Sequence, residues 1–138
     1  MRRDVYSGIL RLYGEESRET VREANNYGCL LRVLNRLDQA KALLRKTIPV
    51  ARRVLGASNE LTLKIRWHYA AALYKDDDAT LDDLREAVTT LEDIERIARR
   101  VFGGAHPLTE GMEEDLRDAQ AALRARETPP SPGSTSSS

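Results

Sequence analysis

The chain has 138 residues, enough for one domain with a hydrophobic core, and it holds 22 Lys/Arg and 22 Asp/Glu. No apolar run approaches the roughly 18 residues of a membrane-spanning helix, and the N-terminus lacks the apolar stretch of a secretory signal. The single cysteine, Cys29, forbids an internal disulfide. These features predict a cytoplasmic protein without a membrane segment.

The zero net charge hides an uneven distribution. Residues 1–75 hold 15 basic and 7 acidic side chains, a balance of +8, whereas residues 76–138 hold 7 basic and 15 acidic ones, a balance of −8. Such asymmetry bears on partners and not on fold. It predicts either attraction of an acidic ligand to the first half or attraction between opposite halves of two molecules.

Apolar residues recur at intervals of three and four throughout the body of the chain, which predicts helices. The first expected helix spans residues 3–13 and the second spans residues 18–34. A short turn then leads to a third helix over residues 37–55, which contains Pro49. Because a proline ring displaces the preceding turn, we expect a kink there.

The fourth expected helix spans residues 60–74. The fifth spans residues 81–101, with Thr80 as its cap, and the sixth runs to about residue 126. The remaining residues, 127–138, are rich in Pro and Ser and lack large apolar side chains, so we expect them to be disordered.

The junctions between these helices repeat each other. A glycine follows a large apolar residue at Gly14, Gly56 and Gly103, so the first step is 42 residues (14 to 56) and the second is 47 (56 to 103). Each junction leads into a helix that begins with a threonine: Thr20, Thr62 and Thr109. A period in this range indicates a stacked helical array, which builds a binding surface and not a reaction centre.

The residues around these junctions carry a recognisable pattern. It comprises Thr20-Val21, residues 26–31, residues 35–40 and residues 43–46, followed by residues 53–56, 100–103 and 106–109. This pattern resembles the 42-residue tetratricopeptide repeat of kinesin light chains, with its V-L-G ending and H-P-x-T start, over about residues 5–123. The resemblance implies an all-α fold, a right-handed helical solenoid of about six antiparallel helices.

The same resemblance implies a division of the chain. It consists of a half repeat (1–16), two repeats (17–58 and 59–105), a capping helix (106–126) and the disordered tail. Together they give one helical repeat domain over residues 1–126. Arg117 stands where the repeat needs a small residue, which predicts that the last helix ends the stack with a hydrated outer face.

In this family the first helix of each repeat lines a concave groove. Mapping the motif onto this chain places Cys29 and Ala71 there together with eight side chains that we expect to bind a peptide: Arg22, Asn25, Asn26, Arg32, Lys64, Trp67, His68 and Lys75. Asn side chains can bond the backbone of an extended peptide, while Lys and Arg meet acidic groups. For Trp67 two interpretations stay open, a stacking surface for the ligand or packing between helices.

Other chemistry is poorly supported by the residues present. The acidic run 76–78 lacks the glycine and the closing glutamate of a calcium loop, and two histidines with one cysteine do not make a zinc site. Cys29 with His68 lacks a third, orienting group. No phosphate-gripping loop or known module indicates nucleic-acid binding. The sequence predicts no enzyme, no metal and no cofactor.

The leading prediction is therefore a non-catalytic protein-interaction module with a scaffold or adaptor role. It would hold a short acidic or amphipathic peptide in a groove biased toward basic groups. The alternative is self-assembly, as a homodimer or a head-to-tail stack, through the uncovered face of the first helix and the oppositely charged halves.

Overall fold

The computed structural model describes residues 2–128, and these form six α-helices and no strand. The helices are α1 (Arg2–Tyr13), α2 (Arg18–Val33), α3 (Leu37–Leu55), α4 (Glu60–Tyr74), α5 (Leu81–Phe102) and α6 (Pro107–Glu127). The prediction of an all-helical chain is confirmed. None of the described helices is long and apolar enough to cross a membrane. Of the tail expected to be disordered, residues 127–138, Glu127 belongs to α6 and Thr128 caps it, whereas residues 129–138 lie outside the described residues.

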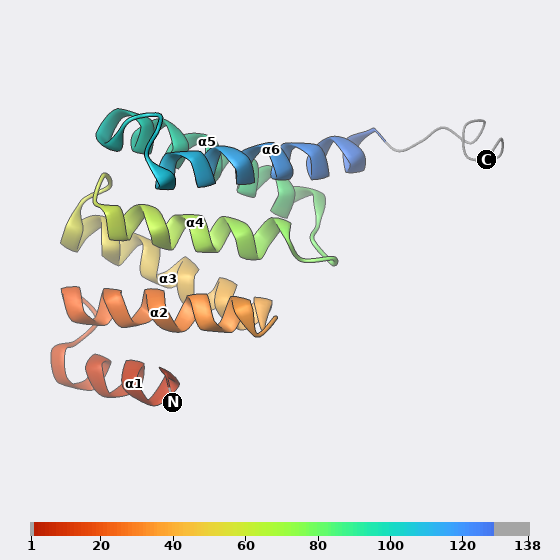
Figure 1. Cartoon of the computed structure of the whole chain (residues 1–138). Coiled ribbons are helices and arrows are strands. Elements are labelled where there is room, and N and C mark those ends of the chain that lie inside the picture. The colour runs from red at the N-terminus through yellow and green to blue at the C-terminus, as the bar shows by residue number, and fades with distance from the viewer. Residues whose placement is uncertain (1, 129–138) are drawn as a thin grey trace.

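The helices are stacked in chain order, so that each one packs against the next (Figure 1). In addition, α4 contacts both α2 and α6, whereas α3 and α5 lie behind them in the view of Figure 1. At one end of the stack, α1 packs against α2 alone among the described helices. The three helices α2, α4 and α6 therefore share one side of the molecule.

The three repeated junctions have the same backbone geometry. Gly14, Gly56 and Gly103 have φ values of 81°, 96° and 95°, a left-handed region that favours glycine. Three residues further on, a side chain accepts a backbone N–H of the next helix and caps it: Ser17, Asn59 and His106. Residues separated by the 42- and 47-residue steps are therefore structurally equivalent.

One continuous core runs from α2 to α6. Its largest fully buried side chains are Leu44, Leu63, Ile65, Leu73, Leu91, Ile94 and Met112. The threonine that opens each repeated helix is also buried, at Thr20, Thr62 and Thr109. Because these helices bury their apolar stripes against both chain neighbours, the stack holds together without a sheet.

The helices α2 and α3 approach each other closely at a glycine. A Cβ atom built on Gly28 would lie 2.6 Å from Cδ2 of Leu44, a side chain with no exposed surface. The helix α3 itself continues through Pro49 to Leu55. Asn35, in the turn between the two helices, has φ 61°, a conformation that Asn adopts more readily than most residues.

At the far end of the stack, α6 presents charged side chains outward. Arg117, the equivalent of Gly28, is exposed and its Nη1 lies 3.0 Å from Oε1 of Glu113. Glu113 in turn pairs with Arg99 of α5 at 2.7 Å. A further helix packed on this face would bury these charges, which is unfavourable.

Replacing Gly28 by alanine tests the packing of the stack. We expect Gly28→Ala to lower the free energy of unfolding by about 1–2 kcal/mol, because the new Cβ must displace the buried Leu44. The control is Gly8→Ala in α1, where a Cβ meets nothing within 4 Å; it should gain about 0.5–1 kcal/mol from helix propensity. Urea denaturation of dilute protein measures both, and equal effects would contradict the close approach.

Candidate functional site

The candidate site is the side shared by α2, α4 and α6, which we call the inner face. On α2 it carries residues at helical spacing, from Arg22 through Asn26 to Arg32, and on α4 it runs from Lys64 through His68 to Lys75. The 47-residue step extends the same stripe onto α6. Two hollows lie on this face, and His68 lines both of them.

The first hollow lies mainly on α2 and has a volume of about 390 Å³. Its lining combines polar and apolar groups: Arg2, Asn25, Asn26, Cys29, Leu30, Val33 and His68. Leu30 and Val33 are among the exposed large apolar side chains of the described chain. The hollow therefore offers an apolar wall beside amide groups.

The second hollow lies between α2, α4 and α6 and has a volume of about 250 Å³. It is lined by Arg32, Trp67, His68, Ala71, Lys75 and Asp115. Two cationic side chains, Arg32 and Lys75, thus face the same space as one carboxylate, Asp115. Six of the eight side chains predicted for the groove line one of the two hollows.

The other two predicted side chains lie on the same stripes but outside the hollows. Arg22 is exposed on α2. Lys64 forms an ion pair with Glu60, one turn earlier on α4, at 3.1 Å. An exposed pair of this kind contributes little stability, so Lys64 can exchange it for another acidic partner.

Two buried polar atoms on the inner face lack a hydrogen-bond partner within the described chain. One is Oδ1 of Asn25, an acceptor, and the other is Nε of Arg32, a donor. Buried groups of this kind are nearly always bonded in folded proteins, because an unsatisfied donor or acceptor costs about 1–3 kcal/mol. Asn25 lines the first hollow and Arg32 lines the second, on either side of His68, while the two atoms themselves are turned away from the open space.

His68 is held in its neutral form. Burial lowers its pKa to about 4, and the positive charges of Arg32 and Lys64 act in the same direction. At neutral pH the ring therefore offers one donor and one acceptor nitrogen and no charge. Cys29 lines the same hollow, but no hydrogen bond joins the described Cys29 and His68 side chains.

Trp67 lies at the contact between α4 and α6. Its indole Nε1 donates a hydrogen bond of 2.6 Å to Asp115, and its ring lies where a Cβ on Gly111 would be 2.6 Å away. The Tyr74 hydroxyl donates a hydrogen bond of 2.9 Å to the other oxygen of Asp115. The pKa of Tyr74 is raised, mainly by burial and also by this hydrogen bond. These contacts favour the interpretation that Trp67 packs between helices. The side chain also lines the second hollow.

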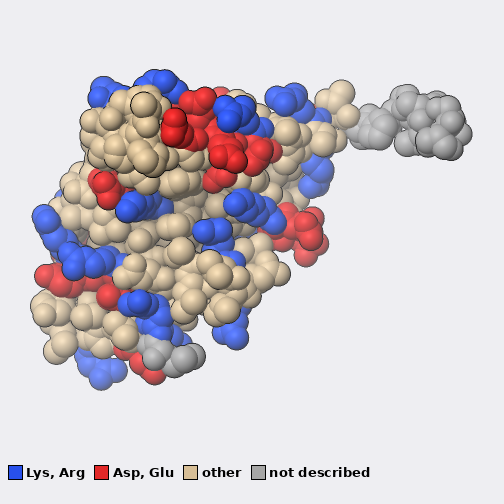
Figure 2. Space-filling model, viewed as in Figure 1, with Lys and Arg blue, Asp and Glu red and all other residues tan. Residues whose placement is uncertain are grey.

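The sequence prediction did not include the part of the inner face that α6 contributes. The equivalents of Trp67, His68 and Ala71 on α6 are Glu114, Asp115 and Asp118, so the face becomes acidic there. Figure 2 shows acidic groups gathered over α6 and basic groups over α4 and α2. Extending the 47-residue step to the last helix would have identified these carboxylates.

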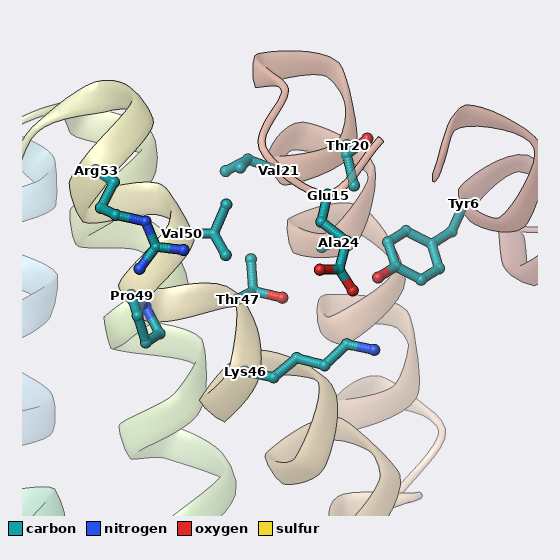
Figure 3. A pocket seen from close by; sticks show the side chains of 10 residues that line it. All are labelled: Tyr6, Glu15, Thr20, Val21, Ala24, Lys46, Thr47, Pro49, Val50 and Arg53. Atoms are coloured by element: carbon teal, nitrogen blue, oxygen red, sulfur yellow. The ribbon is translucent and has the colours of Figure 1, made fainter. Parts of the chain in front are cut away.

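A separate cavity of about 260 Å³ opens on the opposite side, between α1 and α3, with α2 as its floor (Figure 3). Two differences between the repeats accompany it. In the second repeat the equivalent of Ala24 is Arg66, whose buried Nη1 lies 2.8 Å from Asp93 of α5. Ala24 leaves that volume empty, and Lys46 stands in the place of Asp93. Glu15 and Tyr6 face Lys46 across the opening (Figure 3).

The acidic loop after α4 is tied to α3. Asp76 accepts hydrogen bonds from the backbone N–H of Asp78 at 3.0 Å and from Lys41 at 3.1 Å. Both bonds lower the pKa of Asp76, and the bond from Asp78 has the larger effect. No group of three or more His, Cys, Asp or Glu side chains in the described part of the chain is arranged to hold a metal ion. The loop geometry is that of a helix connection braced by one lysine.

Comparison with known proteins gives no family for this chain. No protein-family model matches it, and no curated protein matches it significantly.

The pKa of His68 makes stability depend on pH. The unfolded chain binds a proton at this residue near pH 6.5 and the folded chain only near pH 4, so acidification across this window favours unfolding. The loss is at most about 3 kcal/mol. We expect His68→Asn to lose less stability than the wild type between about pH 7 and about pH 4.5, measured by urea denaturation.

The control for this experiment is His106→Asn, which removes the other histidine and replaces its cap acceptor, Nδ1, by an amide oxygen. It leaves His68 in place, so the pH dependence should persist. An identical pH dependence in wild type and His68→Asn would contradict the buried, neutral histidine.

A second prediction concerns the contact between α4 and α6. Asp115→Ala leaves Trp67 Nε1 and the Tyr74 hydroxyl without their acceptor, and should lower the free energy of unfolding by about 1–3 kcal/mol. Glu114→Ala, at the adjacent exposed residue, should change it by no more than about 0.5 kcal/mol. Tryptophan fluorescence reports the change directly, since Trp67 is the chain's one tryptophan. An unchanged emission spectrum in Asp115→Ala would place the indole elsewhere.

Proposed function

We propose that this chain is a non-catalytic, cytoplasmic interaction module that binds an extended peptide across the inner face of α2, α4 and α6. The observation that carries the proposal is the pair of unsatisfied buried atoms, Asn25 Oδ1 and Arg32 Nε, on either side of His68. A peptide backbone offers N–H donors and C=O acceptors at regular intervals, so one extended segment can satisfy both atoms once the Asn25 amide and the Arg32 guanidinium turn toward it.

The fold that we propose is a right-handed solenoid of the tetratricopeptide type, similar to that of kinesin light chains. Its support is internal to the chain. Three junctions, at Gly14, Gly56 and Gly103, share a left-handed glycine and a capped helix start, and α4 contacts α2 on one side and α6 on the other. Repeats stacked in this manner bring their first helices together into one surface.

The charges of the inner face favour a particular ligand. On α2 and α4 most of its charged side chains are basic, namely Arg22, Arg32, Lys64 and Lys75, and the acidic Glu60 is paired with Lys64. On α6 they are acidic, at Glu114, Asp115 and Asp118. We therefore propose a peptide whose acidic residues lie over α2 and α4, with an apolar side chain beside Leu30 and Val33 and a neutral or basic segment over α6.

The proposal assigns no catalytic role to Cys29 and His68, although they line one hollow. Catalysis by a cysteine and a histidine needs a hydrogen bond between them and a third group that orients the ring. The described hydrogen bonds include neither. A scaffold or adaptor role fits a surface that binds and does not react.

Selection from a displayed library of random linear peptides tests the proposal. We expect the wild-type chain to enrich peptides with clustered Asp and Glu, and Arg32→Glu with Lys75→Glu to lose their binding by about tenfold or more, because both cations face the second hollow. Fluorescence polarisation of a labelled, selected peptide measures the loss, and raising the salt concentration should weaken binding to the wild type.

The matched control reverses two basic side chains on the other layer, Arg52→Glu on α3 and Arg100→Glu on α5, with the same change in net charge. These variants should bind the selected peptide as the wild type does. If both double variants lost peptide binding equally, the loss would reflect net charge and not the inner face. If the selection did not enrich acidic peptides, the result would contradict an acidic ligand on the inner face.

A further inference from the structure

The helix α1 exposes an apolar stripe at the end of the stack. The stripe consists of Val5, Gly8, Ile9 and Leu12, which lie on one side of the helix. Val5 is 43% and Leu12 is 77% exposed, and a Cβ built on Gly8 would meet nothing within 4 Å. Since α1 packs against α2 alone among the described helices, this side has no covering element there.

The positions equivalent to Val5 and Ile9 are covered in the later helices. Val5 corresponds to Thr47 of α3 and to Ile94 of α5, which are 5% and 0% exposed. Ile9 corresponds to Ala51 and Ala98, both fully buried. In those helices the same side packs against the preceding helix, α2 or α4. Val5 and Ile9 therefore lie where the later helices pack against a neighbour, whereas Leu12 extends the stripe to a position that is exposed in α5 as well.

Charged residues beside the stripe identify the helix that fits it. Asp4 and Arg11 lie next to the stripe on the same flank, seven residues or about two turns apart, and neither forms an ion pair with another described residue. If a second α1 is laid antiparallel across the first, Asp4 of each copy comes opposite Arg11 of the other. Val5 likewise comes opposite Leu12, and Gly8 lies near the centre, where the backbones approach most closely.

We propose that two copies of this chain pair through their α1 stripes, antiparallel and with two-fold symmetry centred near Gly8. The pairing is self-complementary in both its apolar and its charged contacts, as a two-fold interface requires. It covers a surface at the low end of specific interfaces, so the dimer forms at high protein concentration and weakens as salt screens the ion pairs.

The opposite end of the molecule does not fit the stripe. A head-to-tail stack would place the α1 stripe on the outer side of α6, where the equivalents of Val21, Ala24 and Gly28 are Glu110, Glu113 and Arg117. Burying these charges against Val5 and Leu12 would be costly. The structure thus favours a closed pair over an open chain of molecules.

Sedimentation equilibrium over a concentration series at low salt tests the proposal. We expect the average mass to rise from 15.5 kDa toward twice that value and to stop there. A monomer at every concentration would overturn self-pairing and leave the stripe to the helix of another protein. A mass that keeps rising past the dimer would instead indicate head-to-tail growth and would also overturn the proposal.

Charge exchange provides the sharper test. Asp4→Arg alone places arginine opposite arginine and should weaken the dimer by about tenfold. Adding Arg11→Asp restores opposite charges in both symmetry-related pairs, and should return the dissociation constant to within about threefold of the wild type. Both residues are exposed, so neither change threatens the fold, which circular dichroism verifies. Failure of the double variant to recover association would overturn the antiparallel arrangement.

Leu12→Glu tests the apolar contact, and the chain supplies its own control. Val101 is the equivalent of Leu12 on α5 and is 47% exposed, so Val101→Glu introduces the same charge at the same helix position elsewhere. We expect Leu12→Glu to abolish the dimer and Val101→Glu to leave it unchanged. The reverse result would move the interface from α1 to α5.

Discussion

The close packing of α2 on α3, where Leu44 lies against the backbone at Gly28, is the contact on which the other features depend. Its equivalent brings α4 onto α5 at Ala70, a residue with no exposed surface. Small residues at this position let the two helices of a hairpin approach closely, so their remaining sides face the neighbouring hairpins. At α6 the same position is Arg117, and the described helices end there with a charged surface.

From that packing the inner face follows. Once α4 contacts both α2 and α6, side chains separated by 42 or 47 residues lie beside each other, and His68 comes between the hollows of Asn25 and Arg32. The electrostatic character of the face then depends on the residues that each copy carries. Basic groups on α2 and α4 give way to carboxylates on α6, and a ligand that spans the face meets both signs of charge.

One position shows how far equivalent sites diverge. Ala24 in α2 leaves a cavity, the buried Arg66 in α4 fills the same place and pairs with the partly exposed Asp93, and Glu113 in α6 forms surface pairs with Arg99 and Arg117. The backbone is the same in all three cases and the environments are not. The helix α1 shows a similar difference in environment between equivalent positions. Val5 is exposed, whereas the equivalent residues of α3 and α5 are buried.

Much of this protein is determined locally, by the chain itself. Three local features could be read from the sequence, because each depends on neighbours within a few residues. They are the helix starts at Ser17, Asn59 and His106, the left-handed glycines before them, and the 3.6-residue spacing of apolar side chains. Contacts across helices were not. The bond from Trp67 to Asp115 spans 48 residues, the depressed pKa of His68 requires burial beside Arg32, and the cavity at Ala24 requires α1 and α3 to lie on either side of α2. The sequence determined where each helix begins and which side is apolar, whereas the tertiary structure decided which polar groups meet, because burial and long-range contact exist only after the helices pack.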